Sequence, residues 1–144
     1  MFKLFSESTQ YAIQTMIHLA CNPKDKTMVS AIAKSEDIPP HYLGKIAQTL
    51  AKHHLIKTSR GRTGGIILNK PPEDIRIIDI VVAINGSPET PEMCVFGLDF
   101  CSDSAPCPIH PEWKGLKEDI INKLMNQNLL SLADELKKKH NFMT

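Results

Sequence analysis

The sequence contains no apolar run that approaches the roughly 20 residues needed to cross a bilayer, and it has no internal repeat or low-complexity tract. It also lacks a phosphate-binding loop, a nucleophile with an adjacent base, and a pair of carboxylates whose spacing suggests catalysis. These absences disfavour a membrane-spanning protein, a repeat protein and an enzyme. With 144 residues, of which 42% are hydrophobic and 23% charged, the chain is long enough for one domain with a hydrophobic core, and we expect it to be soluble.

The beginning of the sequence lacks the features of an export signal. Lys3 is the one basic residue before the first apolar stretch, and Glu7, Gln10 and Gln14 interrupt that stretch ahead of Cys21. We therefore expect a cytoplasmic protein, in a reducing compartment that disfavours disulfides. Clustered cysteines in such a protein are expected to bind a metal or to act as redox-active thiols.

Charge is distributed unevenly, although the formal net charge is only +1. Residues 1–70 hold ten Lys and Arg against four Asp and Glu, whereas residues 71–144 hold seven against twelve. A basic first half on a nearly neutral chain indicates a local surface that binds a polyanion.

Periodicity and turn residues predict three helices in the first half of the chain. Apolar residues repeat at helical spacing over residues 11–20, a short helix follows from Val29, and a third helix is expected over residues 41–52. The turn before the third helix contains Ile38, which we expect to be buried, and two prolines suited to the start of a helix.

The third predicted helix has two distinct faces. Its apolar face is formed by Leu43, Ile46, Ala47 and Leu50, which have the spacing of a packed stripe. The residues of this helix that could contact bases or phosphates are His41, Tyr42, Lys45, Gln48, Thr49 and Lys52. Taken singly, each could equally be a solvated surface residue.

Two β-prone runs, residues 55–58 and 66–68, predict a hairpin. The loop between them carries Arg60, Arg62 and three glycines, and its arginines could enter a minor groove or bind phosphate. The order of helix, helix, turn, helix and basic hairpin is that of a winged helix-turn-helix domain. We therefore predict a mainly α fold with a small β-hairpin that binds double-stranded DNA.

The second half is expected to contain a loop between two helical regions. An apolar helix is predicted within residues 75–84, and residues 87–111 are expected to be a loop because they hold five of the ten prolines. A long helix is expected from Pro111, with a break near residues 126–128 and a short last helix after it.

Three cysteines and a histidine cluster in this loop, with the spacing Cys94-x6-Cys101-x5-Cys107-x2-His110. Structural zinc sites usually draw on tight C-x2-C pairs, and only the last two of these residues have that spacing. The wider gaps favour an iron–sulfur cluster, in which a histidine can replace one thiolate. Alternatively, Cys94 is a core residue and His110 caps the helix that begins at Pro111.

Four segments, taken together, resemble the Rrf2 family of bacterial winged-helix regulators, which includes the IscR, NsrR, RirA and CymR types. The segments are YAIQTMIHLA (11–20), IAKSEDIPPHYLGKIAQTLAKHHLI (32–56), SRGRTGGIIL (59–68) and CVFGLDFCSDSAPCPIHPEW (94–113). The resemblance covers nearly the whole chain. It implies a homodimer, crossed through long C-terminal helices, that binds a pseudo-palindromic operator and responds to a cluster held by Cys94, Cys101 and Cys107.

The resemblance leaves two possibilities for the fourth ligand of the cluster. IscR-like members use a histidine three residues after the last cysteine, which His110 matches. NsrR-like members use a carboxylate on the first helix of the partner subunit, at the position that aligns with Gln10, and the nearest acid here is Glu7. The match favours His110 and a 2Fe-2S cluster, with a 4Fe-4S cluster as the alternative. Gly44 stands where IscR carries an acid, so the operator sequence of IscR does not transfer.

These observations predict a DNA-binding domain over residues 1–86, a cysteine-rich sensor loop over 87–111, and a dimerisation helix with a tail over 112–144. The expected function is a transcriptional regulator, of the repressor kind, whose cluster senses iron–sulfur status, nitric oxide or redox state. One alternative is a regulator that uses the same cysteines as thiols or zinc ligands. The other is an iron–sulfur carrier of electrons or clusters.

Overall fold

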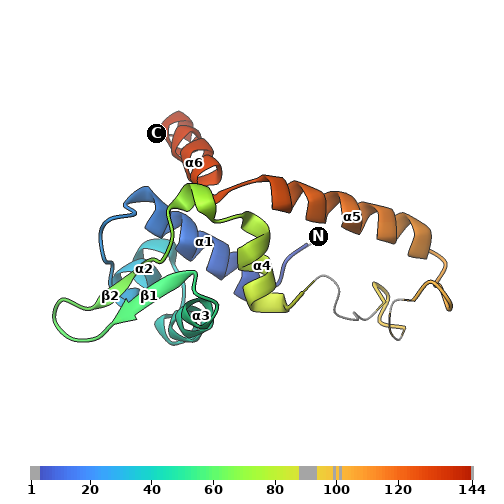
Figure 1. Ribbon diagram of the computed structural model, residues 1–144, viewed down its shortest axis with the longest axis horizontal. Coiled ribbons are helices and arrows are strands. Elements are labelled where there is room, and N and C mark those ends of the chain that lie inside the picture. The colour runs from blue at the N-terminus through green and yellow to red at the C-terminus, as the bar shows by residue number, and fades with distance from the viewer. Residues whose placement is uncertain (1–3, 88–93, 99, 101, 144) are drawn as a thin grey trace.

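A computed structural model describes residues 4–87, 94–98, 100 and 102–143. It is mostly helical, with a single two-stranded sheet among these residues (Figure 1). The elements are α1 (Glu7–Cys21), α2 (Val29–Glu36), α3 (Pro40–Lys52), β1 (Ile56–Ser59), β2 (Gly65–Leu68), the 3-10 turn η1 (Pro72–Asp74), α4 (Ile77–Asn85), α5 (His110–Asn126) and α6 (Leu129–Met143).

The hydrophobic core lies among α1, α2, α3, the hairpin and α4. All four residues of the predicted apolar face of α3 are buried, and so is Ile38 in the turn that precedes it. Met16 on α1 is fully buried in the same core. The predicted mainly α fold with a winged helix-turn-helix is therefore confirmed, because each amphipathic stripe packs as its spacing indicated.

The predicted hairpin forms the wing, and an isolated β-bridge from Thr27 supports it. β1 and β2 pair antiparallel, with Ile56 opposite Leu68. Thr27 pairs with Ile66 on the side of β2 opposite β1. The backbone nitrogen of Thr27 lies 2.9 Å from the carbonyl oxygen of Ile66, and the nitrogen of Ile66 lies 2.8 Å from the oxygen of Thr27. This pairing attaches the segment before α2 to the wing. The sequence pattern did not predict it, because one isolated bridge has no periodicity.

Gly65 is a position in the wing where both the backbone conformation and the available space disfavour a side chain. Its φ angle is 148°, and an added Cβ would lie 2.7 Å from the carbonyl oxygen of Thr27. We expect Gly65→Ala to lower the free energy of unfolding by about 1–3 kcal/mol, measured by urea denaturation. Gly44→Ala is the control, because a Cβ there meets nothing within 4 Å and alanine favours the helix. Equal stability of the Gly65→Ala variant and the unmodified chain would contradict this account.

The C-terminal part contains one projecting helix and one helix that returns to the core. α5 packs against α4, and His110 is its one buried residue. α6 packs on α1 and η1, with Leu129 and Ala133 buried. Backbone bonds from Leu129 to Ile75 (2.7 Å) and from Ile77 to Gln127 (3.0 Å) hold the junction of the two helices.

The expectation of a short last helix is wrong. α6 has 15 residues, and the side chain of Asn128 accepts a hydrogen bond from the backbone N–H of Ser131 (2.8 Å) at its start. The core therefore includes residues beyond the first 86. None of the described helices is both long and apolar enough to cross a membrane.

Candidate nucleic-acid interface and candidate metal centre

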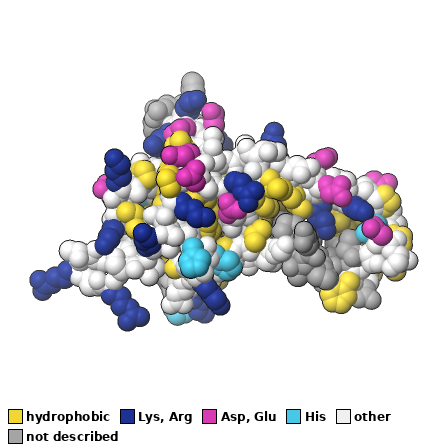
Figure 2. Space-filling view, in the orientation of Figure 1, with side chains coloured by type: hydrophobic (Ala, Val, Ile, Leu, Met, Phe, Trp, Pro, Cys, Tyr) yellow, Lys and Arg dark blue, Asp and Glu magenta, His cyan; other side chains and the backbone are white. Residues whose placement is uncertain are grey.

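The polar face of α3 is accessible, as expected of a helix that reads DNA. His41, Lys45, Gln48 and Lys52 are exposed, and Thr49 is half-buried. Arg60 and Arg62 are exposed in the loop between β1 and β2. Figure 2 shows basic side chains projecting at the end of the molecule where the wing lies. α3 and the wing therefore lie in the same half of the molecule, and they carry all the predicted DNA-binding residues (Figure 1).

Two of the predicted contact residues also have partners within the protein. Tyr42 is 37% exposed, its ring stands edge-on to Tyr11 with centroids 5.5 Å apart, and its hydroxyl shares a hydrogen bond with the hydroxyl of Ser8. The Thr49 hydroxyl donates to the backbone carbonyl of Lys45 at 3.2 Å. These contacts fix both side chains, and those of Tyr42 connect the start of α3 to the first half of α1.

A partly buried hydrogen bond connects the first turn of α1 to the end of α4. Thr9 is fully buried, and its hydroxyl donates to the side-chain oxygen of Asn85 at 3.2 Å. Asn85 is the last residue of α4, directly before the segment that leads to the cysteines. Sequence reasoning missed Thr9 and Ser8, because neither residue has a periodic or motif signal.

Two of the three loop cysteines and His110 line one cavity of about 360 Å³. Cys94 is buried, Cys107 is half-buried, and neither is in a disulfide. Cys101 lies outside the described residues. Leu98, Phe100 and Pro106 complete much of the wall. The cavity lies at the start of α5, at the opposite end of the long axis from the wing (Figure 1).

The turn after Cys94 surrounds its sulfur with hydrogen-bond donors. The backbone N–H of Phe96 lies 3.5 Å from Sγ, and this contact is the main cause that lowers the pKa of Cys94. Burial raises that pKa, whereas Cys107 and the backbone N–H groups of Leu98 and Gly97 lower it further. Gly97 allows the tight turn through a φ of 75°. The arrangement favours the thiolate, which is the form that ligates metals and reacts with oxidants.

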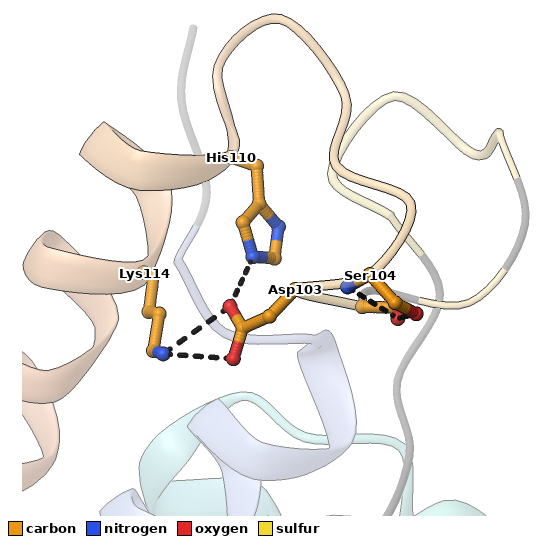
Figure 3. Close-up of polar contacts among 5 residues, drawn as sticks. Asp103, Ser104, His110 and Lys114 are labelled. Carbon is orange, nitrogen blue, oxygen red and sulfur yellow. Dashed lines mark hydrogen bonds and ion pairs between the residues drawn. The ribbon is translucent and has the colours of Figure 1, made fainter.

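His110 is bound by an acidic residue that sequence reasoning did not find. Its Nε2 lies 2.8 Å from Oδ1 of Asp103, and Nζ of Lys114 lies 3.0 Å from the other carboxylate oxygen (Figure 3). The hydrogen bond to His110, followed by Lys114, lowers the pKa of Asp103. Ile109 is the N-cap residue, and no side chain caps this helix. The alternative that His110 merely caps α5 is therefore wrong.

The residues that the structure describes include part of the predicted donor set. Among them, no three His, Cys, Asp or Glu side chains gather closely enough to hold an ion. Two sulfur donors and one imidazole nevertheless line the same cavity. This donor set fits an iron–sulfur cluster, with Cys101 as the remaining thiol between them in the sequence.

The alternative fourth-ligand positions lie on α1. Gln10 donates through its side-chain amide to the backbone carbonyl of Phe5 at 3.3 Å, and Glu7 is exposed in the first turn. Neither is among the described residues that line the cysteine cavity. Within one subunit, His110 is therefore the better placed of the proposed fourth ligands.

Comparison with known proteins finds transcriptional regulators. The model of the Rrf2 family, described as iron-dependent transcriptional regulators, matches residues 5–135. An Aquifex aeolicus protein that carries the name of an HTH-type transcriptional regulator is 32% identical over 141 residues, which is 96% of each chain. The regulator NsrR of Halalkalibacterium halodurans is 40% identical over 74 residues, which is 51% of each chain.

Solved structures with the same fold are also regulators. CymR, the global cysteine regulator of Bacillus subtilis, superposes with a TM-score of 0.75 at 26% identity, over 94% of this chain and 98% of CymR. IscR of T. potens superposes with a TM-score of 0.72 at 26% identity, over 99% of this chain and 92% of IscR. The similarity therefore extends over the winged domain and the C-terminal helices.

Proposed function

Because the chain belongs to the Rrf2 family of transcriptional regulators, we propose that it binds operator DNA as a homodimer whose affinity is set by an iron–sulfur cluster. Family membership makes it a DNA-binding regulator and not an enzyme. It also argues against the alternative of an electron or cluster carrier, which gives no role to the basic wing. We further propose the division into a DNA-binding domain, a sensor loop and a dimerisation helix.

The observation that carries the proposal is the cavity shared by Cys94, Cys107 and His110. The proposed ligands are these three residues and Cys101, with a 2Fe-2S cluster favoured and a 4Fe-4S cluster as the alternative. When bound, the cluster would supply iron and sulfide that react with oxidants or nitric oxide. The protein contributes a stabilised thiolate at Cys94 and an imidazole held by Asp103.

A second copy of the chain is proposed to cover the apolar side of α5. Leu116 is 48% exposed, and Trp113, Ile120 and Leu124 are half-buried along this helix. Trp113 and Ile120 also line an apolar groove of about 160 Å³ between α5, α4 and the beginning of the chain. A helix that leaves such a stripe open is typical of a bundle completed by a partner.

The hydrogen bonds of α1 offer a route from the sensor loop to α3. Binding of a cluster by the loop would fix the orientation of α5 relative to α4, because the loop joins the two helices. Asn85 at the end of α4 bonds to Thr9, and Ser8 beside it bonds to Tyr42 on α3. Couplings of this kind typically amount to about 1–3 kcal/mol, or roughly 5-fold to 150-fold in affinity.

A thiol-based regulator without a cluster is the second candidate. Cys107 lowers the pKa of Cys94 by a side-chain hydrogen bond, and both cysteines line the same cavity. Two neighbouring thiols, one of which favours the thiolate, are suited to sensing an oxidant. One matching solved structure is an oxidized form of Staphylococcus aureus CymR, with a TM-score of 0.71 at 25% identity. Iron analysis separates the two candidates.

The test is purification without oxygen, followed by a visible spectrum and by measurement of iron and acid-labile sulfide per chain. We expect a coloured protein that loses its colour with nitric oxide or air and whose affinity for DNA changes at the same time. A colourless, iron-free dimer that is folded and binds DNA would favour the thiol-based regulator instead.

A further inference from the structure

We propose that Asp103 is the positioning residue for the fourth ligand: its carboxylate holds His110 through Nε2 and thereby directs Nδ1 to the cavity of Cys94 and Cys107. This inference rests on the proposed cluster site and adds a residue that the spacing of the cysteines does not indicate. Asp103 lies in the loop between Cys101 and Cys107.

The geometry around the imidazole supports this role. The side chain of His110 is 9% exposed, and its Nε2 lies 2.8 Å from Oδ1 of Asp103. A carboxylate accepts only, so this bond places the ring proton on Nε2 and leaves the lone pair on Nδ1. In Figure 3, Nδ1 points away from Asp103. The ring therefore presents its basic nitrogen on the side opposite the carboxylate.

Lys114 keeps Asp103 in place. Its Nζ lies 3.0 and 3.2 Å from the two carboxylate oxygens, and it is one helical turn beyond His110 on α5. Asp103 itself is 72% exposed, so without partners its side chain would adopt other rotamers. Both of its partners come from the first turns of α5. The three residues thus join the loop to this helix on the side of the cavity.

A carboxylate behind a metal-binding histidine fixes the orientation and the tautomer of the ring and increases its basicity. Loss of such a partner typically lowers metal affinity by about 10-fold to 100-fold. We therefore expect Asp103→Ala, loaded with cluster without oxygen, to release iron to a ferrous chelator about 10-fold to 100-fold faster than the unmodified chain. Asp103→Asn, which keeps an acceptor oxygen but loses the charge, should fall between the two.

A double-substitution cycle separates positioning from a general effect on the loop. In the His110→Ala background, adding Asp103→Ala should not change the rate of iron release further, because Asp103 acts through the ring. Glu112→Ala is the matched control, since it removes an exposed acid from the same first turn of α5. Equal rates for Asp103→Ala and the unmodified chain, or additive effects in the double variant, would overturn the proposal.

A measurement on the metal-free protein distinguishes failure of this inference from failure of the proposed function. The nitrogen-15 shifts of the His110 ring should report a proton on Nε2 in the unmodified chain, and Asp103→Ala should lose that preference. A ring protonated on Nδ1 in the unmodified chain would overturn the role of Asp103, whether or not the protein carries iron. Absence of iron from every variant would count against the cluster itself.

Discussion

Cys107→Ala, purified without oxygen, is expected to be colourless and to contain almost no iron. Its affinity for DNA should then no longer respond to nitric oxide or air, whereas the unmodified chain should show a change of about 5-fold to 150-fold. The physical reason is that Cys107 lies in the same cavity as Cys94 and His110, so its loss removes a proposed ligand and one of the groups that lower the pKa of Cys94. Iron analysis and a DNA titration before and after exposure to nitric oxide measure both effects.

Cys21→Ala is the matched control for this substitution. Cys21 is also a free, half-buried cysteine, but it lies at the end of α1 and lines a different pocket, beside His18 and Glu36. Its replacement should leave the colour, the iron content and the response unchanged. If Cys107→Ala keeps the normal response, control of DNA binding does not pass through this site.

Arg60→Ala combined with Arg62→Ala is expected to weaken binding to duplex DNA by about 10-fold or more at roughly 0.1 M salt, because removing positive charge from the wing weakens its attraction to phosphate. Both arginines are exposed in the loop at the end of the wing, where a ligand can reach them. For every phosphate that the variant no longer neutralises, the slope of log affinity against log salt should also fall by about 0.9. Titration of a mixed-sequence duplex at several salt concentrations gives both quantities.

Lys138→Ala tests whether any loss of positive charge has the same effect. Lys138 is exposed on α6 and pairs with Glu135, away from the wing. Its replacement should change neither affinity nor slope appreciably. If the double arginine variant weakens binding with an unchanged slope, the arginines contact bases and not phosphates. If it binds as well as the unmodified chain, the wing does not contact DNA.

The elements that could be predicted from the sequence are those whose signal is local. The helical spacing in α1 and α3 and the β-prone residues around the wing each act within a few positions, and the structure confirms these elements. The length of α6 was not predicted, because it depends on the burial of Leu129 and Ala133 against a helix more than 100 positions earlier. Tertiary packing, more than helix propensity, stabilises a helix of this kind.

For the candidate site, the sequence predicted Cys94, Cys107 and His110, which line one cavity, but it did not predict the contacts that support them. The spacing of the cysteines and His110 indicated a metal centre from the sequence alone. Asp103 gave no such signal, because a single acid in a loop that also contains serines is ordinary, and only the fold places it against His110 and Lys114. Thr9 and Asn85 are 76 positions apart, so no sequence pattern connects them.

The pairing of Arg76 with Asn128, together with buried Leu129, anchors one end of α5, while His110 and the cysteine loop occupy the other. α5 therefore connects the candidate site at its first residue to the junction with α6. A helix of 17 residues is about 25 Å long, so a sideways shift of about 4 Å at the His110 end turns it by only about 10°. In the proposed dimer, gain or loss of the proposed cluster would therefore rotate α5 only slightly and would change the separation of the two α3 helices by a small amount.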